Sequence, residues 1–329
     1  MAQVIPIERA RRQPDRCQAL TAAGRSCRNK ARQNGFCGVH RPPGPAERVG
    51  PFSAAVVREL VELIRRRLVG DYEVDEFGFD PELTEKALLP LVKPLYDYYW
   101  RVDWLGLEHV PSKGAAILVG NHAGTVPVDS LVMKFGVLDR HSSHRHVRLL
   151  AADLAFRFPV VAPLARKMGS TLACDEDALR LLGNGELVGV FPEGYKGVGK
   201  GFRNRYKLQR FGRGGFVELA LKARVPIIPV AIVGSEEIYP MIHNAKTLAR
   251  MAGFPYFPIT PFFPWLGPLG LIPLPSKWII AFGEPISTAQ HGPEAVEDQQ
   301  LVLEMAEETR QAVQGLLEEY LPRRRNSFI

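Results

Sequence analysis

The sequence predicts an α/β fold in which helices flank a mostly parallel central sheet. Five short segments are apolar at nearly every position, which indicates strands buried on both faces; they span 115–121, 147–152, 186–191, 226–234 and 277–283. Helical patterns separate them, near 126–137, 159–168, 175–183 and 212–224. Because a helix between two strands returns the chain to the end where the first strand began, this alternation predicts parallel pairing.

Further helices are expected before and after this α/β region. The segment 51–69 has apolar residues at helical spacing and Ser53 placed for the N-cap; its apolar face could pack on the rest of the protein or lie on a membrane. Other helices are expected over 82–100 and 294–320. We therefore divide the chain into a basic module with its linker (1–48), N-terminal helices (49–105), an α/β domain (106–290) and a C-terminal helix with a basic tail (291–329).

Positive charge is concentrated at the N-terminus. Residues 1–48 contain ten Lys and Arg against three Asp and Glu, whereas the remaining 281 residues carry 32 of each sign. Such a segment favours an anionic membrane surface, and nucleic acid is not expected as a partner. The chain shows no apolar core of a secretory signal, no window of 18 apolar residues, and four cysteines. We therefore expect a protein bound peripherally at the cytoplasmic face of a membrane.

Three cysteines and a histidine near the N-terminus are spaced like metal ligands in a segment with little apolar material for a core. Three thiolates and one imidazole complete a tetrahedral structural zinc site, and metal binding supplies folding energy in such modules. The pattern resembles short Cys-Cys-Cys-His modules and predicts a structural zinc; the alternative is a disordered basic tail. The ligands would be Cys17, Cys27, Cys37 and His40.

A second histidine group has no such support. The sequence around it, "HSSHRH", could hold a metal, but it has no neighbouring carboxylate or motif, so we interpret it as an exposed loop. Its members are His141, His144 and His146.

The segment from Phe191 to Arg203 nearly matches a phosphate-binding P-loop. Gly194, Gly199 and Lys200 have the P-loop spacing, but Gly201 stands where a P-loop has the Ser or Thr that holds magnesium. A basic stretch broken by glycines follows, instead of an amphipathic helix. The sequence therefore argues against a nucleotide site.

The same stretch is dense in positive charge, with no acidic residue between Glu193 and Glu218. Because the stretch follows a predicted strand, it lies at the sheet edge where α/β proteins bind ligands, and it predicts a site for an anionic substrate. The alternative is a solvated basic loop. The seven basic residues are Lys196, Lys200, Arg203, Arg205, Lys207, Arg210 and Arg213.

A histidine and an aspartate follow the first predicted strand of the α/β domain, in "GNHAGTVPVDS" (120–130). Gly124 and Pro127 would bend the intervening loop so that His122 and Asp129 meet. An imidazole can take a proton from a hydroxyl near neutral pH, and a carboxylate on its other ring nitrogen fixes the tautomer. The pair predicts a general base with its orienting partner; the alternative is a structural His–Asp contact.

Together these motifs resemble the glycerolipid acyltransferase family, which contains the lysophosphatidic acid acyltransferases. Three blocks occur in the family's order over roughly Val102 to Pro285: "NHAGTVPVD" (121–129), "VFPEG" (190–194) and "VPIIPV" (225–230). The resemblance implies that His122 is the general base and Asp129 its partner. It implies substrate-binding roles for Asn121, Gly124, Phe191, Pro192, Glu193, Gly194 and Lys196, to which the basic loop adds Arg203 and Arg205.

Two features depart from the common family pattern. Six residues separate His122 from Asp129 where the family usually has four, which resembles the branch related to mono- and diacylglycerol acyltransferases. The family's arginine block is not evident, and residues 168–178 in its place contain acids and no Arg. Both leave open whether the acceptor carries a phosphate, as 1-acylglycerol-3-phosphate does, or is a neutral glyceride.

The resemblance implies acyl transfer from acyl-CoA or acyl carrier protein to a glycerolipid hydroxyl. A hydroxyl activated by a base attacks the thioester directly, so no Ser or Cys nucleophile is required. One alternative is a lipid esterase or thioesterase that uses the same pair to activate water, and another is a non-enzymatic, membrane-associated zinc adaptor. The uncharged, proline-rich stretch 254–275 predicts either a membrane-docking surface or a lid over the acyl groove.

Overall fold

The structure, a computed structural model, describes residues 54–123, 126–159, 161–251, 253–324 and 328. The predicted zinc ligands Cys17, Cys27, Cys37 and His40 lie outside these residues, as do Ser53 and Gly124. By its contacts the chain divides into residues 1–61 and a larger unit of residues 62–329. Within the described part of the chain, the helices are too short or too polar to cross a membrane.

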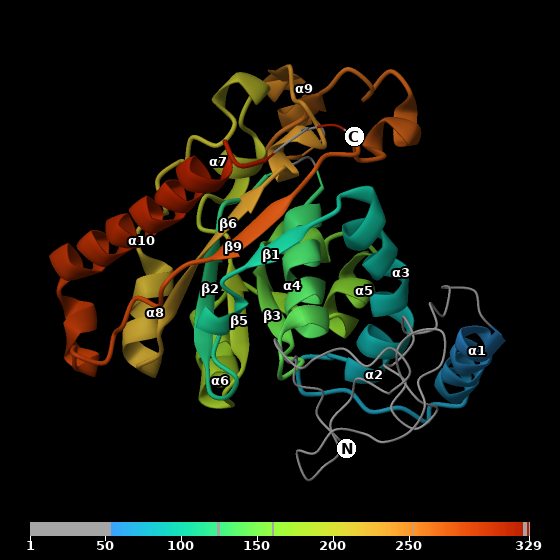
Figure 1. Ribbon diagram of the computed structural model, residues 1–329, viewed down its shortest axis with the longest axis horizontal. Helices are drawn as coiled ribbons and strands as arrows, with labels where there is room; N and C mark the ends of the chain where they lie inside the picture. Colours follow the sequence, from blue (N-terminus) through green and yellow to red (C-terminus); the bar gives the residue numbers. More distant parts are fainter. Residues whose placement is uncertain (1–53, 124–125, 160, 252, 325–327, 329) are drawn as a thin grey trace, which may run out of the picture. The chain divides into compact units, whose positions relative to one another are not determined.

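The larger unit is built on a mostly parallel sheet of seven strands among the described residues, which confirms the predicted fold class (Figure 1). Strands β6, β2, β5, β3 and β4 run parallel, whereas β9 is antiparallel to β6 and β1 is parallel to β9. In spatial order the strands are β1 (Asp103–Leu105), β9 (Ile279–Phe282), β6 (Ile227–Val233), β2 (Ala116–Gly120), β5 (Leu187–Val190), β3 (Val147–Ala151) and β4 (Ser170–Leu172).

The five predicted strands are all present, and the continuous burial of β2, β5 and β6 matches their apolar sequences. The sequence did not predict β1 and β4, because a strand of three residues is too short to show a pattern.

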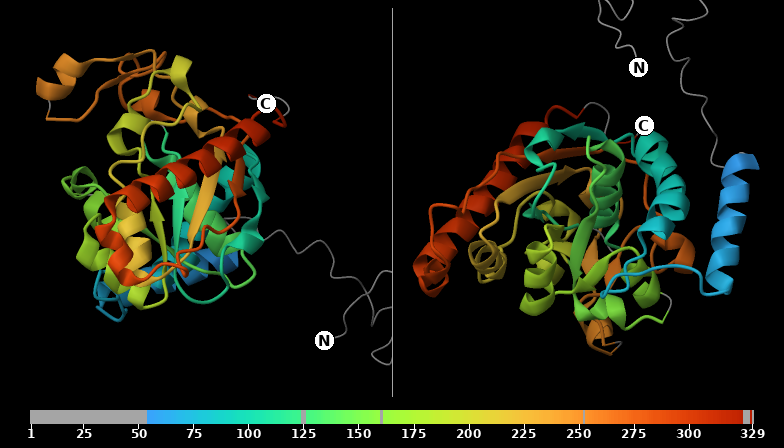
Figure 2. Two further views of the ribbon diagram at one scale, coloured as in Figure 1. Left: turned by 90° about the vertical axis from the view of Figure 1, so that its left-hand side faces the viewer. Right: turned by 90° about the horizontal axis from the view of Figure 1, so that it is seen from below.

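Helices cover both faces of the sheet (Figures 1 and 2). Side chains of α4 and of the turns before β1 fill the core on one face, and side chains of α6, α8 and α10 fill it on the other. Across the described residues, whether or not they lie on the sheet, the α-helices are α1 (Ala54–Leu68), α2 (Pro81–Leu83), α3 (Leu89–Pro94), α4 (Val128–Arg140), α5 (Val161–Lys167), α6 (Asp175–Gly183), α7 (Gly194–Val198), α8 (Gly215–Ala223), α9 (Lys246–Met251) and α10 (Gln299–Tyr320).

The helix predicted over 82–100 is present as one continuous helical segment over 81–99, in which α-helical and π-helical turns alternate. π-Helical turns at Thr84–Leu88 and Leu95–Tyr99 adjoin α3, which contains Pro90 and Pro94. A proline has no N–H to donate and its ring crowds the preceding turn, so the regular hydrogen-bond pattern shifts around each one.

Helix α10 shows how sequence pattern becomes packing. The Asp298 side chain caps the helix by accepting from the N–H groups of Gln300 and Leu301. Its buried side chains recur at helical spacing and pack in the core shared with α8 and β6: Val302, Met305, Ala306, Thr309, Val313 and Leu317.

Helix α4, which carries Asp129, packs on β3 and also meets the side chain of Trp104 from β1. A methyl group added to Gly136 would lie 1.8 Å from the ring of Trp104 in β1, so only glycine fits at this position. The glycine therefore leaves room for the Trp104 ring beside the helix.

A long insertion, residues 238–275, separates β6 from β9. It contains α9 and a small antiparallel pair, β7 (His243–Asn244) with β8 (Pro258–Ile259), followed by a 3₁₀ turn at Gly267–Leu271. Figure 1 shows the insertion at the top of the view, beyond the carboxyl ends of the parallel strands. We call it the 238–275 insertion.

Candidate active site

The predicted site residues follow neighbouring parallel strands. Strand β2 lies between β5 and β6, with Val119 level with Val190 on one side and with Pro229 on the other. His122 follows β2, the "FPEG" residues follow β5, and Glu236 follows β6. Because the carboxyl ends of parallel strands meet at one edge of a sheet, these three segments come together there.

His122 and Asp129 contact each other as the sequence predicts. Nδ1 of His122 lies 2.9 Å from Oδ2 of Asp129. Asp129, in the first turn of α4, is fully buried, and its carboxylate also accepts from the N–H groups of Ala123 and Ser130 at 2.7 Å each. The aspartate therefore holds both the ring and the backbone that carries it, and the ring's Nε2 is the nitrogen that remains for a substrate.

The environment of His122 sets its charge. Burial favours the neutral imidazole, but the Asp129 carboxylate outweighs it, and Glu193 adds to the effect, so the pKa of His122 lies above its ordinary value. The side chain is 15% exposed, enough for a substrate hydroxyl to reach the ring.

The "FPEG" turn packs directly on His122. The Phe191 ring lies 4.8 Å from the imidazole, centroid to centroid, and the carboxylate of Glu193 accepts from the N–H of His122 at 3.1 Å. A methyl group at Gly197, in α7, would lie 3.0 Å from the His122 carbonyl oxygen and 2.6 Å from Cβ of Glu193. A side chain at 197 would therefore push the two segments apart.

Two predicted substrate-binding residues are engaged by the protein itself. Asn121 is fully buried, and its amide exchanges hydrogen bonds with the backbone of Ile232 in β6, at 3.1 and 2.7 Å. Glu193 is also buried, and its second oxygen accepts from the N–H of Gln209 at 2.8 Å. These contacts tie β2 to β6 and the "FPEG" turn to the following loop, so both side chains hold the site together.

The basic loop is divided between surface and interior. Lys196, Arg203 and Arg205 are exposed, as a role in binding an anion requires, and Arg205 lines a small cavity together with Ala123. Pro192 and Gly194 are half-buried in the turn. Lys200 is different: its side chain is 5% exposed and lies between Glu193 and Glu236. The interpretation of Lys200 as part of a basic ligand-binding loop is therefore wrong, because two acids close in space, one of them distant in sequence, neutralise it.

The 238–275 insertion brings Tyr256, from the stretch predicted as a docking surface or a lid, close to the site. Tyr256 packs near α7: a methyl group at Gly199 would lie 3.8 Å from its Cβ. Burial raises the pKa of Tyr256 to about 12, and the charges of Tyr195 and Asp129 contribute. The inner side of the insertion therefore reaches the neighbourhood of the His122–Asp129 pair.

The second histidine group is not a metal site. His141 is buried, with Nε2 2.9 Å from the carbonyl oxygen of Val110, so the interpretation as an exposed loop is wrong for this residue. His144 contacts the carbonyl oxygen of Leu138, and His146 contacts Glu85. Across the described residues, no three His, Cys, Asp or Glu side chains are grouped so that they could hold a metal.

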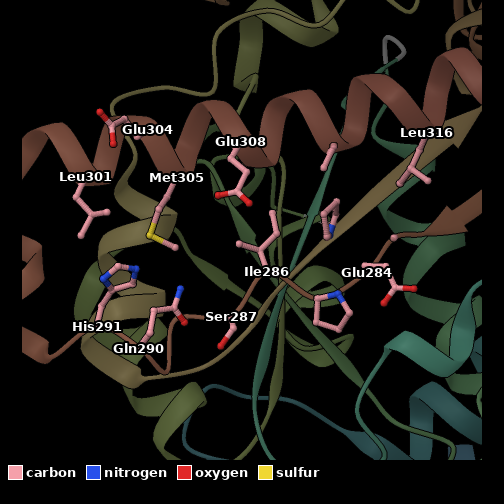
Figure 3. Close-up of a pocket in the computed structure, with 14 residues that line it drawn as sticks. Glu284, Ile286, Ser287, Gln290, His291, Leu301, Glu304, Met305, Glu308 and Leu316 are labelled. Atoms are coloured by element: carbon pink, nitrogen blue, oxygen red, sulfur yellow. The ribbon is translucent and has the colours of Figure 1, made fainter.

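A groove of about 570 Å³ lies elsewhere, between α10 and the segment after β9 (Figure 3). Met305 and Glu308 extend from α10 toward Ile286. Pro229, from the "VPIIPV" block, lines it, but His122, Asp129 and the "FPEG" residues do not. Its rim carries Glu284, Glu304 and Glu308, which would repel a phosphate. The groove is therefore separate from the His122–Asp129 site.

Comparison with known proteins identifies a matching family and several similar proteins. Residues 101–233, which include His122, Asp129 and the "FPEG" turn, match the Acyltransferase family. An uncharacterized protein of Mycobacterium tuberculosis is 52% identical over 275 residues, covering 84% of this chain and 77% of that protein.

Two relatives with named activities are more distant. The chain is 27% identical over 232 residues to the DGAT1/2-independent enzyme synthesizing storage lipids of Gallus gallus, covering 69% of this chain and 64% of that protein. It is 26% identical over 140 residues to the 1-acyl-sn-glycerol-3-phosphate acyltransferase of Borreliella burgdorferi, covering 41% and 52%.

The His122–Asp129 contact predicts the titration of the ring. In the wild-type protein, an NMR titration of His122 should give a pKa above 6.5, because the Asp129 charge outweighs burial. In Asp129→Asn the charge is gone and burial remains, so the pKa should fall below 6.5. An unchanged titration in the folded variant would show that Asp129 does not control the charge of the ring.

Proposed function

Because this chain belongs to the acyltransferase family, we propose that it moves a fatty acyl group from a thioester donor to a hydroxyl of a glycerolipid. The donor is acyl-CoA or an acylated acyl carrier protein, and the acceptor is a lipid such as 1-acylglycerol-3-phosphate. The observation that carries the proposal is the 2.9 Å contact between Nδ1 of His122 and the buried Asp129, at the carboxyl edge of the sheet.

The proposed reaction uses the ring as a proton carrier. Asp129 accepts a hydrogen bond from the Nδ1–H of His122, which holds the tautomer whose unprotonated Nε2 takes the proton of the acceptor's hydroxyl. The resulting oxygen attacks the thioester carbonyl and forms the new ester bond. The carbon–sulfur bond then breaks, and the thiolate leaves with the proton held by His122. Atoms and charge balance without a covalent enzyme intermediate.

Two groups of observations bear on the acceptor, and they favour different classes of lipid. The exposed Lys196, Arg203 and Arg205 suit a phosphate-bearing acceptor or the phosphates of CoA. The similarity to the storage-lipid enzyme of Gallus gallus and the six-residue spacing suit a neutral glyceride. An acceptor panel that includes both classes separates them.

Release of the thiol from acyl-CoA tests the reaction and its base. Release should require an added acceptor, and His122→Ala should lower kcat by about 10²–10⁴ because the general base is lost. Asp129→Asn should lose much of the rate through the wrong tautomer. His291→Ala, in the separate groove, is the matched control and should keep wild-type kcat.

Two outcomes would contradict this proposal. Thiol release that is independent of every acceptor would identify a hydrolase that activates water with the same pair. Near wild-type kcat in a folded His122→Ala protein would remove His122 as the base.

The N-terminal cysteines are proposed to bind zinc, on the sequence pattern alone, since they lie outside the described residues. Metal analysis of the full chain should find about one zinc per molecule, and Cys27→Ser/Cys37→Ser should lose it while acyl transfer stays measurable. The free Cys174, which is partly buried within the α/β region, provides the matched control Cys174→Ser. Stoichiometric zinc in the double variant would place the ligands elsewhere.

The 238–275 insertion is proposed as the surface that docks on the membrane, which holds the acceptor. Trp265 is 71% exposed, and the neighbouring side chains Leu266, Leu269 and Ile272 are all more than half exposed. No acidic residue occurs between Glu237 and Glu284, whereas Lys246 and Arg250 are exposed on α9. An apolar tip with only basic neighbours suits the boundary of an anionic bilayer.

Vesicle binding distinguishes docking from a lid. Trp265→Ser/Leu269→Ser should weaken sedimentation with anionic phospholipid vesicles several-fold and leave turnover of detergent-dispersed substrate near normal, because less apolar area enters the bilayer. The control is Leu303→Ser/Leu95→Ser, two exposed leucines outside the insertion. If vesicle binding is unchanged but the acyl-chain preference shifts, the insertion is a lid over the acyl groove.

A further inference from the structure

Lys200 is a buried cation in the middle of the site. Its ammonium lies 3.1 Å from Oε2 of Glu193 and 3.0 Å from Oε1 of Glu236, and its side chain is 5% exposed. A lysine is rarely buried to this extent, and a buried pair stabilises a protein only when its partners are well placed. The position therefore calls for an explanation beyond surface charge.

Glu193 connects this cation to His122. One of its oxygens accepts from the N–H of His122 at 3.1 Å; the other accepts from the N–H of Gln209 and faces Lys200. The ammonium is thus one carboxylate away from the backbone of the proposed base. Loss of the ammonium would leave Glu193 buried with an uncompensated charge.

Glu236 connects the cation to a third strand. It follows β6, is buried, and lines a small cavity together with Ala123, the residue after His122. Burial raises the pKa of Glu236 to about 7, and the charge of Lys200 opposes that rise. Two carboxylates therefore share one cation at the joint ends of β2, β5 and β6.

The remaining charged groups around this cluster are already paired or face outward. Glu237, next to Glu236, contacts Arg324 and accepts from the hydroxyl of Tyr206 at 3.1 Å. Arg205 lines the same small cavity, but its guanidinium lies over the ring of Phe202 at 4.4 Å. Of the described cations, Lys200 is the one placed between both buried carboxylates.

We propose that Lys200 is a positioning residue for His122. Lys200 neutralises Glu193, and this carboxylate then holds the His122 backbone and, with it, the ring against Asp129. The proposal rests on the proposed acyl-transfer function for its kinetic readout, but not for its effect on the ring. The charge of Lys200 also lowers the pKa of His122, opposing Asp129 and Glu193. This keeps more of the base in its neutral, active form near neutral pH.

The test compares Lys200→Met with Lys200→Met/Glu236→Gln. The single variant leaves two buried carboxylates without a cation and is expected to be destabilised; the double variant removes one of them and should regain thermal stability. In both, we expect kcat to fall at least tenfold, while KM changes less. The surface variant Lys222→Met, on α8, is the matched control for loss of a lysine and should change neither constant.

The pH readout separates positioning from mere packing. A general base works when neutral, so kcat/KM falls as the pH drops through the His122 pKa. Removing the Lys200 charge favours the protonated ring and should move this acidic limb upward by about 0.5–1.5 pH units. Lys200→Arg keeps the charge and should keep the limb within a few tenths of a unit of the wild type, even if kcat is lower.

Failure of the Lys200 proposal can be distinguished from failure of the proposed acyl-transfer function. An NMR titration of His122 needs no substrate, so an upward shift of its pKa in the double variant supports the proposal even if every acceptor tested is inactive. The proposal is overturned if the double variant has the kcat, the acidic limb of the kcat/KM profile and the His122 titration of the wild type. Lys200 would then serve only to neutralise Glu236.

Discussion

The buried carboxylate of Glu193 is the contact on which the site depends. It joins the backbone of His122, in the loop after β2, to the ammonium of Lys200 and the backbone of Gln209, both in the basic loop. A carboxylate can be buried only if charge and hydrogen bonds compensate it, so these partners hold each other in place. The loop after β2 and the turn after β5 are thereby fixed to each other before any substrate arrives.

The sheet makes this contact possible. Strand β2 pairs in parallel with β5 on one side and β6 on the other, so the segments that follow all three begin at the same level. Asn121 then pairs with the backbone of Ile232, which locks the end of β2 to β6. Gly197 lets α7 approach the His122 carbonyl oxygen more closely than any side chain would permit. Asp129 comes from the first turn of α4, and Gly136 in the same helix leaves room for the Trp104 ring.

The charged residues at the carboxyl ends of β2, β5 and β6 differ in how deeply they are buried. The inner cluster of Glu193, Lys200 and Glu236 is nearly dry, whereas Lys196, Arg203 and Arg205 from the same loop face solvent. Beyond them the 238–275 insertion presents apolar side chains outward and Tyr256 inward. A buried charged interior, exposed basic side chains and an apolar outer surface are consistent with the proposed transfer of an acyl group to a membrane lipid.

The order of strands and helices, the mostly parallel sheet and the His122–Asp129 contact were predictable from the sequence, because apolar periodicity and motif spacing are local properties. Short strands such as β1 were missed because three residues show no pattern and their pairing depends on the neighbouring strand. The state of Lys200 was decided only by the tertiary structure. A lysine in a basic stretch looks the same in sequence whether exposed or buried, and the acid that completes its burial, Glu236, comes from another strand 36 residues away. Desolvation and pairing of that charge arise only when the sheet brings the two strand ends together.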